Sequence, residues 1–146
     1  MINVKNLKKF YPNERQFNLL RRKGDYPCGW VDSIDKLAET LLPSKDAFYS
    51  RLKGEWITDE DYKHAKEVWD EFEMKIFLKY HKLYNKTDVL LLVDVFENFR
   101  DVCLENYGLD ATWYYTSPGL SWDAMLKMTK IELEGPRGDS GGRSVP

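Results

Sequence analysis

The stretch Tyr84-Asn-Lys-Thr-Asp-Val-Leu-Leu-Leu-Val-Asp-Val-Phe-Glu-Asn-Phe-Arg-Asp101 decides how the rest of the chain is organised. Its apolar residues recur three and four positions apart, which is the spacing of one face of an α-helix. The residues that share this face are Leu91, Leu92, Val95, Phe96, Phe99, Val102 and Cys103. We therefore predict a long helix from about Tyr84 to Asn106, with this face turned toward the core.

Two polar residues, Tyr84 and Asp88, continue this face toward the N-terminus. They are four positions apart, so they lie on the same side of the helix. An unpaired carboxylate on a buried face carries a large free-energy cost, so it needs an explanation. In one explanation, Asp88 lies near the helix start and stabilises free backbone N–H groups and the positive end of the helix dipole. In the other, Asp88 binds a divalent metal and Tyr84 points its hydroxyl at a metal-bound water, which suits phosphodiester hydrolysis.

The composition is that of a globular domain, or of a piece of a larger one. The chain has 146 residues, of which 42% are hydrophobic and 14% aromatic, enough for a packed core. Charged residues make up 32% of the chain, but the formal net charge is only −2. This balance argues against an autonomous nucleic-acid-binding protein, which usually carries a basic excess.

Cysteines and histidines show no metal-binding pattern. Cys28 and Cys103 lie far apart, and His64 and His81 are isolated, so a zinc site is not expected. Two scattered cysteines fit reduced thiols in an intracellular compartment, although the sequence leaves a disulfide between them open. The longest apolar run, Val89–Val93, is too short to cross a membrane, so no membrane partner is expected.

Helix start signals place the other elements. Thr58 is a good N-cap and Asp61 stands at the capping-box position, which predicts a helix from Thr58 to Phe72. Ser117 followed by Pro118 predicts an N-cap and a first helical residue, with a helix that ends near Met128.

Shorter elements are expected between these helices. Asp32 or Ser33 begins a short helix, and Phe77–Leu83 forms a short helical segment before the long helix. Gly108 is a natural stop for the long helix. Any strand is expected to be short and to lie around Cys28–Val31.

Two groups of residues have alternative interpretations. Arg21, Arg22 and Lys23 either contact a phosphate backbone or form a solvated basic face. Thr116, Ser117 and Gly119 either approach a nucleic-acid strand through backbone N–H groups or simply cap the following helix.

Five blocks between Arg21 and about Lys127 form an ordered series: Lys23–Pro27, Leu42–Tyr49, Thr58–Tyr62, Tyr84–Arg100 and Tyr114–Met125. In this order they resemble the organellar and viral protein-primed type of family B DNA polymerase. Tyr84-x-x-x-Asp88 with its apolar run is similar to the third exonuclease motif of that family.

The resemblance implies a mainly α fold: a helical fragment of a ribonuclease H-like 3′-5′ exonuclease domain, with little or no sheet of its own. Residues 1–134 would be the partial exonuclease domain and residues 135–146 a disordered tail. In the intact enzyme, Asp88 would bind Mg²⁺ and Tyr84 would orient the water or the scissile phosphate. DNA and deoxynucleotides would be its substrates, and a mobile element or a virus its source.

The chain departs from the family pattern in one important respect. The first exonuclease motif, Asp-x-Glu on a strand, is absent from these 146 residues, and so are the polymerase aspartate motifs. One carboxylate provides too few oxygen ligands for a pair of Mg²⁺ ions. We therefore expect the isolated chain to be inactive and to bind Mg²⁺ weakly, with the missing exonuclease and polymerase segments as its partners.

A second hypothesis is a non-catalytic helical interaction module. It expects Asp88 to be neutralised by a helix cap or by a lysine, and the apolar faces to close on one another. The fragment hypothesis expects Asp88 to face an open shelf, with uncovered apolar surface beside it.

Overall fold

The computed structural model describes residues 4–133, which fold into five α-helices and three short 3₁₀ helices. The α-helices are α1 (Lys5–Phe10), α2 (Glu14–Leu20), α3 (Asp59–Glu71), α4 (Phe77–Tyr107) and α5 (Ser117–Thr129). The 3₁₀ helices are η1 (Ile34–Ala38), η2 (Lys45–Phe48) and η3 (Ala111–Trp113). The chain divides into two compact units, one up to Asn98 and one from Phe99, and α4 contributes to both.

The predicted mainly helical class is confirmed, and no sheet occurs in residues 4–133. The only paired extended residues there are Ser50 and Glu55, which form an isolated bridge. The strand expected around Cys28–Val31 is wrong. The N–H groups of Trp30 and Val31 both donate to the carbonyl of Pro27, so this segment is a turn. The expected tail, residues 135–146, lies outside the described part of the chain.

The long helix begins earlier than predicted. It starts at Phe77 and so incorporates the segment Phe77–Leu83, because no Gly or Pro interrupts the sequence before Gly108. Gly108 adopts a left-handed φ of 61°, and its N–H donates to the carbonyl of Leu104, which ends the helix as expected. None of the helices in residues 4–133 combines the length and apolar character needed to cross a bilayer.

The face of α4 that the spacing predicts as buried is largely exposed. Of its seven residues only Cys103 is buried, and Leu92 is 68% exposed. The residues of α4 that are buried include Phe77, Tyr80, Thr87, Leu90 and Asp94. From Val89 to Phe96 apolar residues occupy almost the whole circumference of the helix, so the spacing alone does not select a face.

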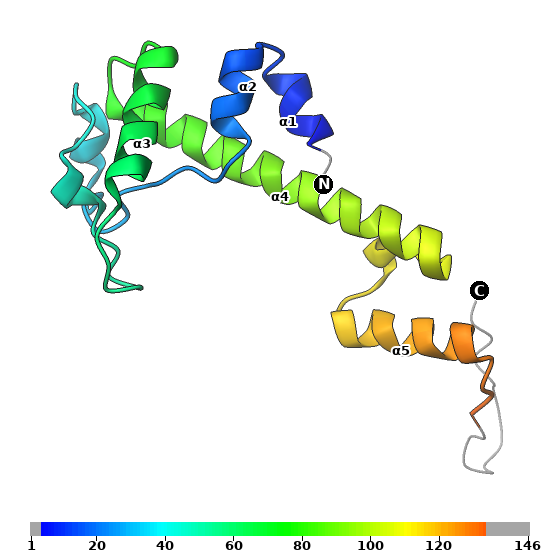
Figure 1. The fold of residues 1–146 in the computed structure, drawn as a ribbon. Helices are drawn as coiled ribbons and strands as arrows, with labels where there is room; N and C mark the ends of the chain where they lie inside the picture. The colour runs from blue at the N-terminus through cyan, green and yellow to red at the C-terminus, as the bar shows by residue number, and fades with distance from the viewer. Residues whose placement is uncertain (1–3, 134–146) are drawn as a thin grey trace. The chain divides into compact units, whose positions relative to one another are not determined.

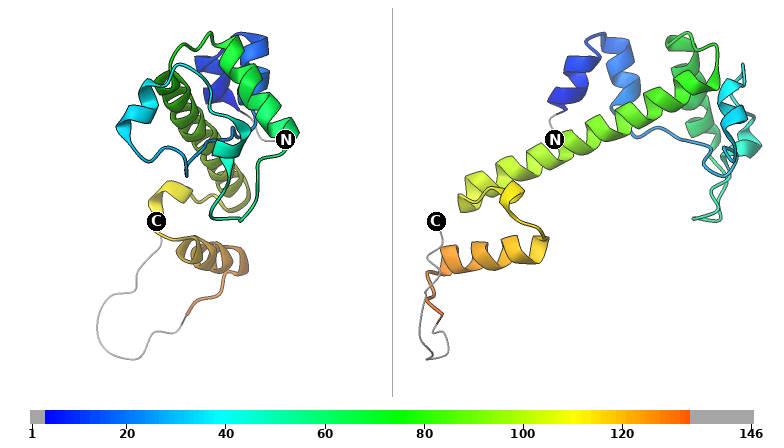
Figure 2. Two further views of the ribbon diagram at one scale, coloured as in Figure 1. Left: turned by 90° about the vertical axis from the view of Figure 1, so that its left-hand side faces the viewer. Right: turned by 180° about the vertical axis from the view of Figure 1, so that it is seen from behind.

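Within the first unit, α1, α2 and α3 lie along the early part of α4 (Figures 1 and 2). The N-cap of α3 is Thr58, whose hydroxyl oxygen accepts from the N–H of Asp61, as predicted. The centre of this core is aromatic, because the fully buried ring of Phe77 stacks on Tyr80 and meets Trp30 edge-on. The further buried residues of the cluster are Leu7, Leu20, Phe48, Ile57, Ala65, Val68, Met74 and Leu90.

The sequence analysis did not predict helices before residue 22, and α1 owes its position to a carboxylate on α4. Asp94 is only 1% exposed. Its Oδ1 accepts from the backbone N–H (2.8 Å) and the side-chain amide (2.9 Å) of Asn6, and its Oδ2 from the N–H of Leu7 (3.0 Å). The residue before α1, Val4, offers no capping oxygen. Asp94 therefore caps α1 from a distant part of the sequence.

The second unit, residues 99–133, packs α5 around its own small core of Cys103, Leu109, Ala111, Leu120 and Ala124. Its helix starts at Ser117 as predicted, but the cap is one residue earlier than expected: the hydroxyl oxygen of Thr116 accepts from the N–H of Gly119. Cys103 here and Cys28 in the first unit are both free thiols.

A bidentate ion pair joins the last part of α4 to the start of η3. From it we predict how the stability of the second unit changes at low pH. Arg100 donates from Nε (2.8 Å) and Nη2 (2.7 Å) to Asp110, which also accepts from the N–H of Thr112. These donors hold the pKa of Asp110 well below its ordinary value of 3.8.

Because this folded-state pKa is lowered, Asp110 stabilises the unit fully above about pH 4, and the contribution is lost as the pH falls through the lowered pKa. In an NMR titration of the Asp110 carboxyl, Arg100→Gln is expected to move the midpoint back toward the ordinary value. The charge-matched Lys127→Gln should leave it unchanged. Equal midpoints in the Arg100 variant and the parent would contradict the assignment.

Candidate functional site

The predicted site residues Tyr84 and Asp88 line a hollow in the first unit, together with Lys23 and Gly24 of the sequence block Lys23–Tyr26. Asp25 and Tyr26 of this block line a second hollow, which they share with Tyr84. This block follows α2 as an extended segment and lies against α4 although about sixty residues separate the two in the sequence. Gly24 lies close to the ring of Tyr84, since a Cβ at this position would be 3.6 Å from its Cδ2. The ring of Tyr26 stacks on that of Tyr84 at 4.8 Å between centroids. Two of the family-like blocks therefore meet here.

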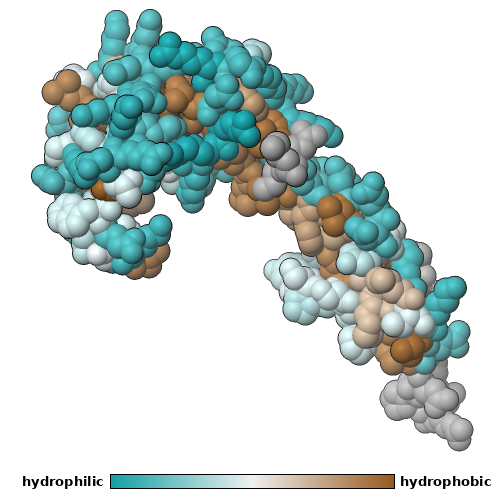
Figure 3. All heavy atoms as spheres, in the orientation of Figure 1, coloured by the Kyte–Doolittle hydropathy of each residue, from teal (hydrophilic) through white to brown (hydrophobic). Residues whose placement is uncertain are grey.

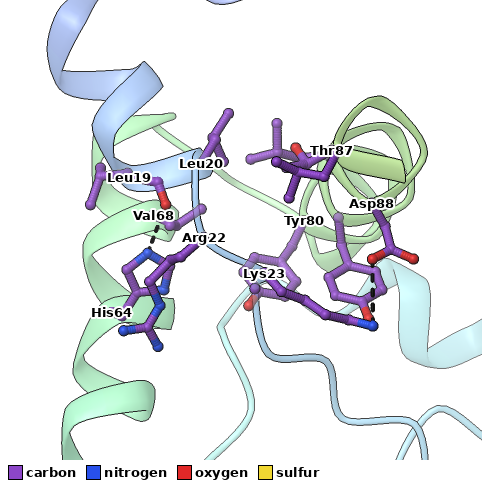
Figure 4. A pocket seen from close by; sticks show the side chains of 13 residues that line it. Leu19, Leu20, Arg22, Lys23, His64, Val68, Tyr80, Thr87 and Asp88 are labelled. Atoms are coloured by element: carbon purple, nitrogen blue, oxygen red, sulfur yellow. Dashed lines mark hydrogen bonds and ion pairs between the residues drawn. The ribbon is translucent and has the colours of Figure 1, made fainter. Parts of the chain in front are cut away.

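Asp88 lies in the middle of α4, about three turns after its start, so the helix-start explanation of this residue is wrong. Figure 4 shows the side chain of Lys23 extended toward Asp88, and the Nζ to Oδ1 distance is 3.6 Å. The side chain of Asp88 is 48% exposed and that of Lys23 71%, which makes this a weak surface ion pair worth at most about 1 kcal/mol. A lysine partner is the feature that the interaction-module hypothesis expects.

The phenol groups beside the hollow resist ionisation. Burial raises the pKa of Tyr84, and the ammonium group of Lys23 opposes part of that shift. Burial also raises the pKa of Tyr26, whose hydroxyl is hydrogen-bonded to Nδ1 of His81 at 2.7 Å. At neutral pH these phenols are protonated, so Tyr84 is available as a hydrogen-bond donor on the same side of α4 as Asp88.

A hydrogen bond from α4 fixes the extended block at its centre. Tyr80 donates from its hydroxyl to the backbone carbonyl of Asp25 at 2.6 Å, and burial raises the pKa of this tyrosine strongly. Burial also raises the pKa of the Asp25 carboxyl, and the nearby carboxylate of Asp61 adds to the shift. α4 thus holds the backbone of the block, while Lys23 and Gly24 line the hollow beside Asp88.

The basic residues predicted as a phosphate contact have different environments. Arg22 forms a hydrogen-bonded ion pair with Asp61, and its guanidinium group lies 3.7 Å from the carboxylate of Asp25. The positive charge of Arg22 is therefore paired with carboxylates of the same unit. Together with a hydrogen bond from Thr58, this pair lowers the pKa of Asp61. Arg21 is exposed, and Lys23 faces Asp88. Only Arg21 is therefore directed to solvent without such a partner among the described residues.

The described residues do not form a Mg²⁺ site by themselves. In residues 4–133 no group of three or more Asp, Glu, His or Cys side chains lies close enough to hold a metal ion. Asp88 offers a single carboxylate beside an ammonium group, whereas Mg²⁺ requires an octahedral set of oxygen ligands. The isolated histidines serve in packing: His64 donates from Nε2 to the carbonyl of Leu19, and His81 lies between Tyr26 and Asn85.

The comparisons with known proteins leave the family assignment as a proposal. Neither the protein-family models, nor the curated proteins, nor the solved structures give a match to this chain.

The other predicted nucleic-acid contacts, Thr116, Ser117 and Gly119, belong to the second unit. Thr116 and Gly119 are engaged with each other as the cap of α5. Ser117 is exposed at the first position of that helix. The alternative interpretation, helix capping, accounts for the observed hydrogen bond.

From the sequence, Tyr26 and Asp25 stood out only as parts of a block and His81 only as an isolated histidine, and Tyr80 was not expected beside the site. The available signal was the aromatic spacing Phe77, Tyr80 and Tyr84, which places three rings on one side of a continuous helix. The sequence prediction placed Phe77 and Tyr80 in a short segment before the long helix, and so did not place their rings beside that of Tyr84.

Proposed function

We propose that the chain is part of the 3′-5′ exonuclease region of a DNA-directed DNA polymerase of family B, of the protein-primed type, and carries its third exonuclease motif. In this role Asp88 provides one metal-binding carboxylate and Tyr84 orients the attacking water or the scissile phosphate. The remaining carboxylates come from segments outside these 146 residues. The fold class proposed with it is a helical piece of a ribonuclease H-like domain.

The packing of Lys23–Tyr26 against Tyr84 and Asp88 is the observation that carries the proposal. Both segments belong to blocks that resemble the family, and about sixty residues separate them in the sequence. Their contact brings a protonated phenol and a half-exposed carboxylate to one side of α4, beside Lys23 and Gly24, which supports the proposal of a partial exonuclease centre.

Uncovered apolar surface on α4 also supports the proposal. Val89, Leu92 and Val95 are between 46% and 68% exposed and lie near Asp88 along the helix. Figure 3 shows apolar surface along α4 beside the hydrophilic side chains that cover the rest of this face. A packed domain normally covers such a strip, so its exposure fits a helix that packs against a further segment.

The test is an exonuclease assay on the coding sequence expressed with its flanking segments. We expect an Asp-x-Glu motif upstream and Mg²⁺-dependent release of nucleotides from the 3′ end of a 5′-labelled single strand. Asp88→Ala is expected to lower this rate by at least about a hundredfold, because a metal-bound nucleophile depends on complete coordination. The matched control, Asp101→Ala, removes an exposed carboxylate from the same helix and should leave the rate unchanged.

Two results would overturn the proposal: equal rates for the two variants, or flanking sequence with no Asp-x-Glu motif in any frame.

A calorimetric titration of Mn²⁺ into the 146-residue chain gives a separate measurement. A dissociation constant weaker than about 10⁻³ M is expected from a single carboxylate.

The second candidate remains a non-catalytic helical interaction module, which the Lys23–Asp88 ion pair favours. It predicts that Asp88→Ala and Asp101→Ala behave alike in every nucleic-acid assay. The exonuclease comparison above therefore separates the two functions.

A further inference from the structure

A stripe of lysines runs along the first three turns of α4. Residues 74–87 contain four lysines and no Asp or Glu, in a chain whose net charge is −2. Lys79, Lys82 and Lys86 are all exposed and project from one side of the helix, at intervals of about 4.5 and 6 Å along its axis. Asp88 lies about 160° around the helix from Lys86, so this surface is separate from the hollow described above.

The three lysines border a shallow groove of about 300 Å³ with a largely apolar and aromatic floor. Tyr11 from the end of α1, and Phe72 and Met74 from the α3–α4 connection, form this floor together with Leu83. Phe10, 52% exposed, lies beside the groove, with Nζ of Lys86 4.4 Å from the centre of its ring. Aromatic side chains therefore lie among the cationic ones.

The positive charge of this surface is not balanced within the described residues. No ion pair is found there for Lys79, Lys82 or Lys86, whereas Glu71 at the end of α3 is paired with Arg15 at 2.8 Å. Lys79 also lies in the first helical turn of α4, where a cation opposes the helix dipole and no acidic residue compensates it. A row of cations without acidic partners, one of them opposed by the helix dipole, indicates an anionic partner.

We propose that this groove binds single-stranded DNA, with the ammonium groups of Lys79, Lys82 and Lys86 on successive phosphates and bases against Phe10 and the groove floor. Charge complementarity selects a polyanion, and the exposed ring of Phe10 with the half-buried rings of Tyr11 and Phe72 beside the lysines favours unstacked bases over a duplex. The choice of DNA rests on the proposed function, but binding here requires neither Asp88 nor a metal ion.

The test is fluorescence anisotropy of a labelled twenty-nucleotide oligothymidine with the 146-residue chain, at several salt concentrations and without divalent ions. The variant combines Lys79→Gln, Lys82→Gln and Lys86→Gln. The control combines Lys53→Gln, Lys63→Gln and Lys66→Gln, which removes the same charge. It also removes the cation–π contact of Lys66 with Tyr62, whereas the test variant removes those of Lys86 with Phe10 and Tyr11. Circular dichroism of both variants checks that the helices are retained.

Loss of the α4 lysines is expected to weaken binding at least tenfold at low salt. It should also reduce the slope of log affinity against log salt by about 2, since each phosphate contact on a single strand contributes about 0.7. Equal weakening by the control triple, or no binding by the parent chain at low salt, would overturn the proposal. Equal affinity for duplex DNA or for polyglutamate would overturn the assignment to single strands. An inactive exonuclease with intact, lysine-dependent binding would reject the proposed function and leave this inference standing.

Discussion

Replacing Asp94 by alanine is expected to lower the free energy of unfolding of the first unit by about 3 kcal/mol, as measured by urea denaturation. The substitution removes a buried carboxylate that accepts three hydrogen bonds from Asn6 and Leu7. It leaves the part-buried N–H of Asn6 and the buried N–H of Leu7 without this acceptor. Charge-assisted hydrogen bonds of this kind contribute about 1.5–3 kcal/mol each, and lost helix caps cost up to about 2 kcal/mol.

Two further variants test whether capping is the cause. Asp94→Asn keeps one oxygen for Asn6 but turns an NH₂ group toward the N–H of Leu7, so about half of the loss is expected. Asp101→Ala on the exposed side of α4 should change stability by less than about 0.5 kcal/mol. Amide hydrogen exchange of Asn6 and Leu7 should accelerate in the Asp94 variants alone. Similar stability of all three variants would show that α1 does not depend on this carboxylate.

Replacing Phe77 by alanine is expected to cost the first unit about 4 kcal/mol of stability. The ring is fully buried and lies between Tyr26, Trp30 and Tyr80, with centroid distances of 5.9, 5.3 and 5.5 Å. Its removal loses the transfer free energy of a large aromatic side chain and leaves a cavity that the surrounding rings are too rigid to fill. Chemical denaturation followed by tryptophan fluorescence reports the change, because Trp30 contacts the ring edge-on.

Phe10→Ala is the matched control for this measurement. It makes the same chemical change at a ring that is 52% exposed, and its expected cost is below about 1 kcal/mol. Restoring a large apolar side chain with Phe77→Leu should recover more than half of the loss. Equal effects of the two alanine substitutions would mean that Phe77 is not central to the core.

Much of the secondary structure could be predicted because its causes are local. Thr58 and Asp61 start α3 through a hydrogen bond between near neighbours, and Gly108 ends α4 because it adopts a left-handed φ. The absence of Gly and Pro from residues 77–107 permits one continuous helix, although the predicted start at Tyr84 was too late and the helix begins at Phe77. The candidate site could likewise be predicted in part, since Tyr84 and Asp88 are one helical turn apart and lie on the same side of the helix.

Local sequence signals thus predict the helical class, both ends of α3 and α5, the end of α4 and the shared side of Tyr84 and Asp88 on that helix. Tertiary packing selects the buried face of α4, since apolar residues surround the helix between Val89 and Phe96 and the partners α1–α3 select the side. It also decided the role of Asp94, which interrupts that apolar run and caps a helix formed by residues far away in the sequence. The ion pair between Lys23 and Asp88 likewise joins residues that are far apart in the sequence. Such contacts depend on how distant segments pack, and local propensity carries no information about them.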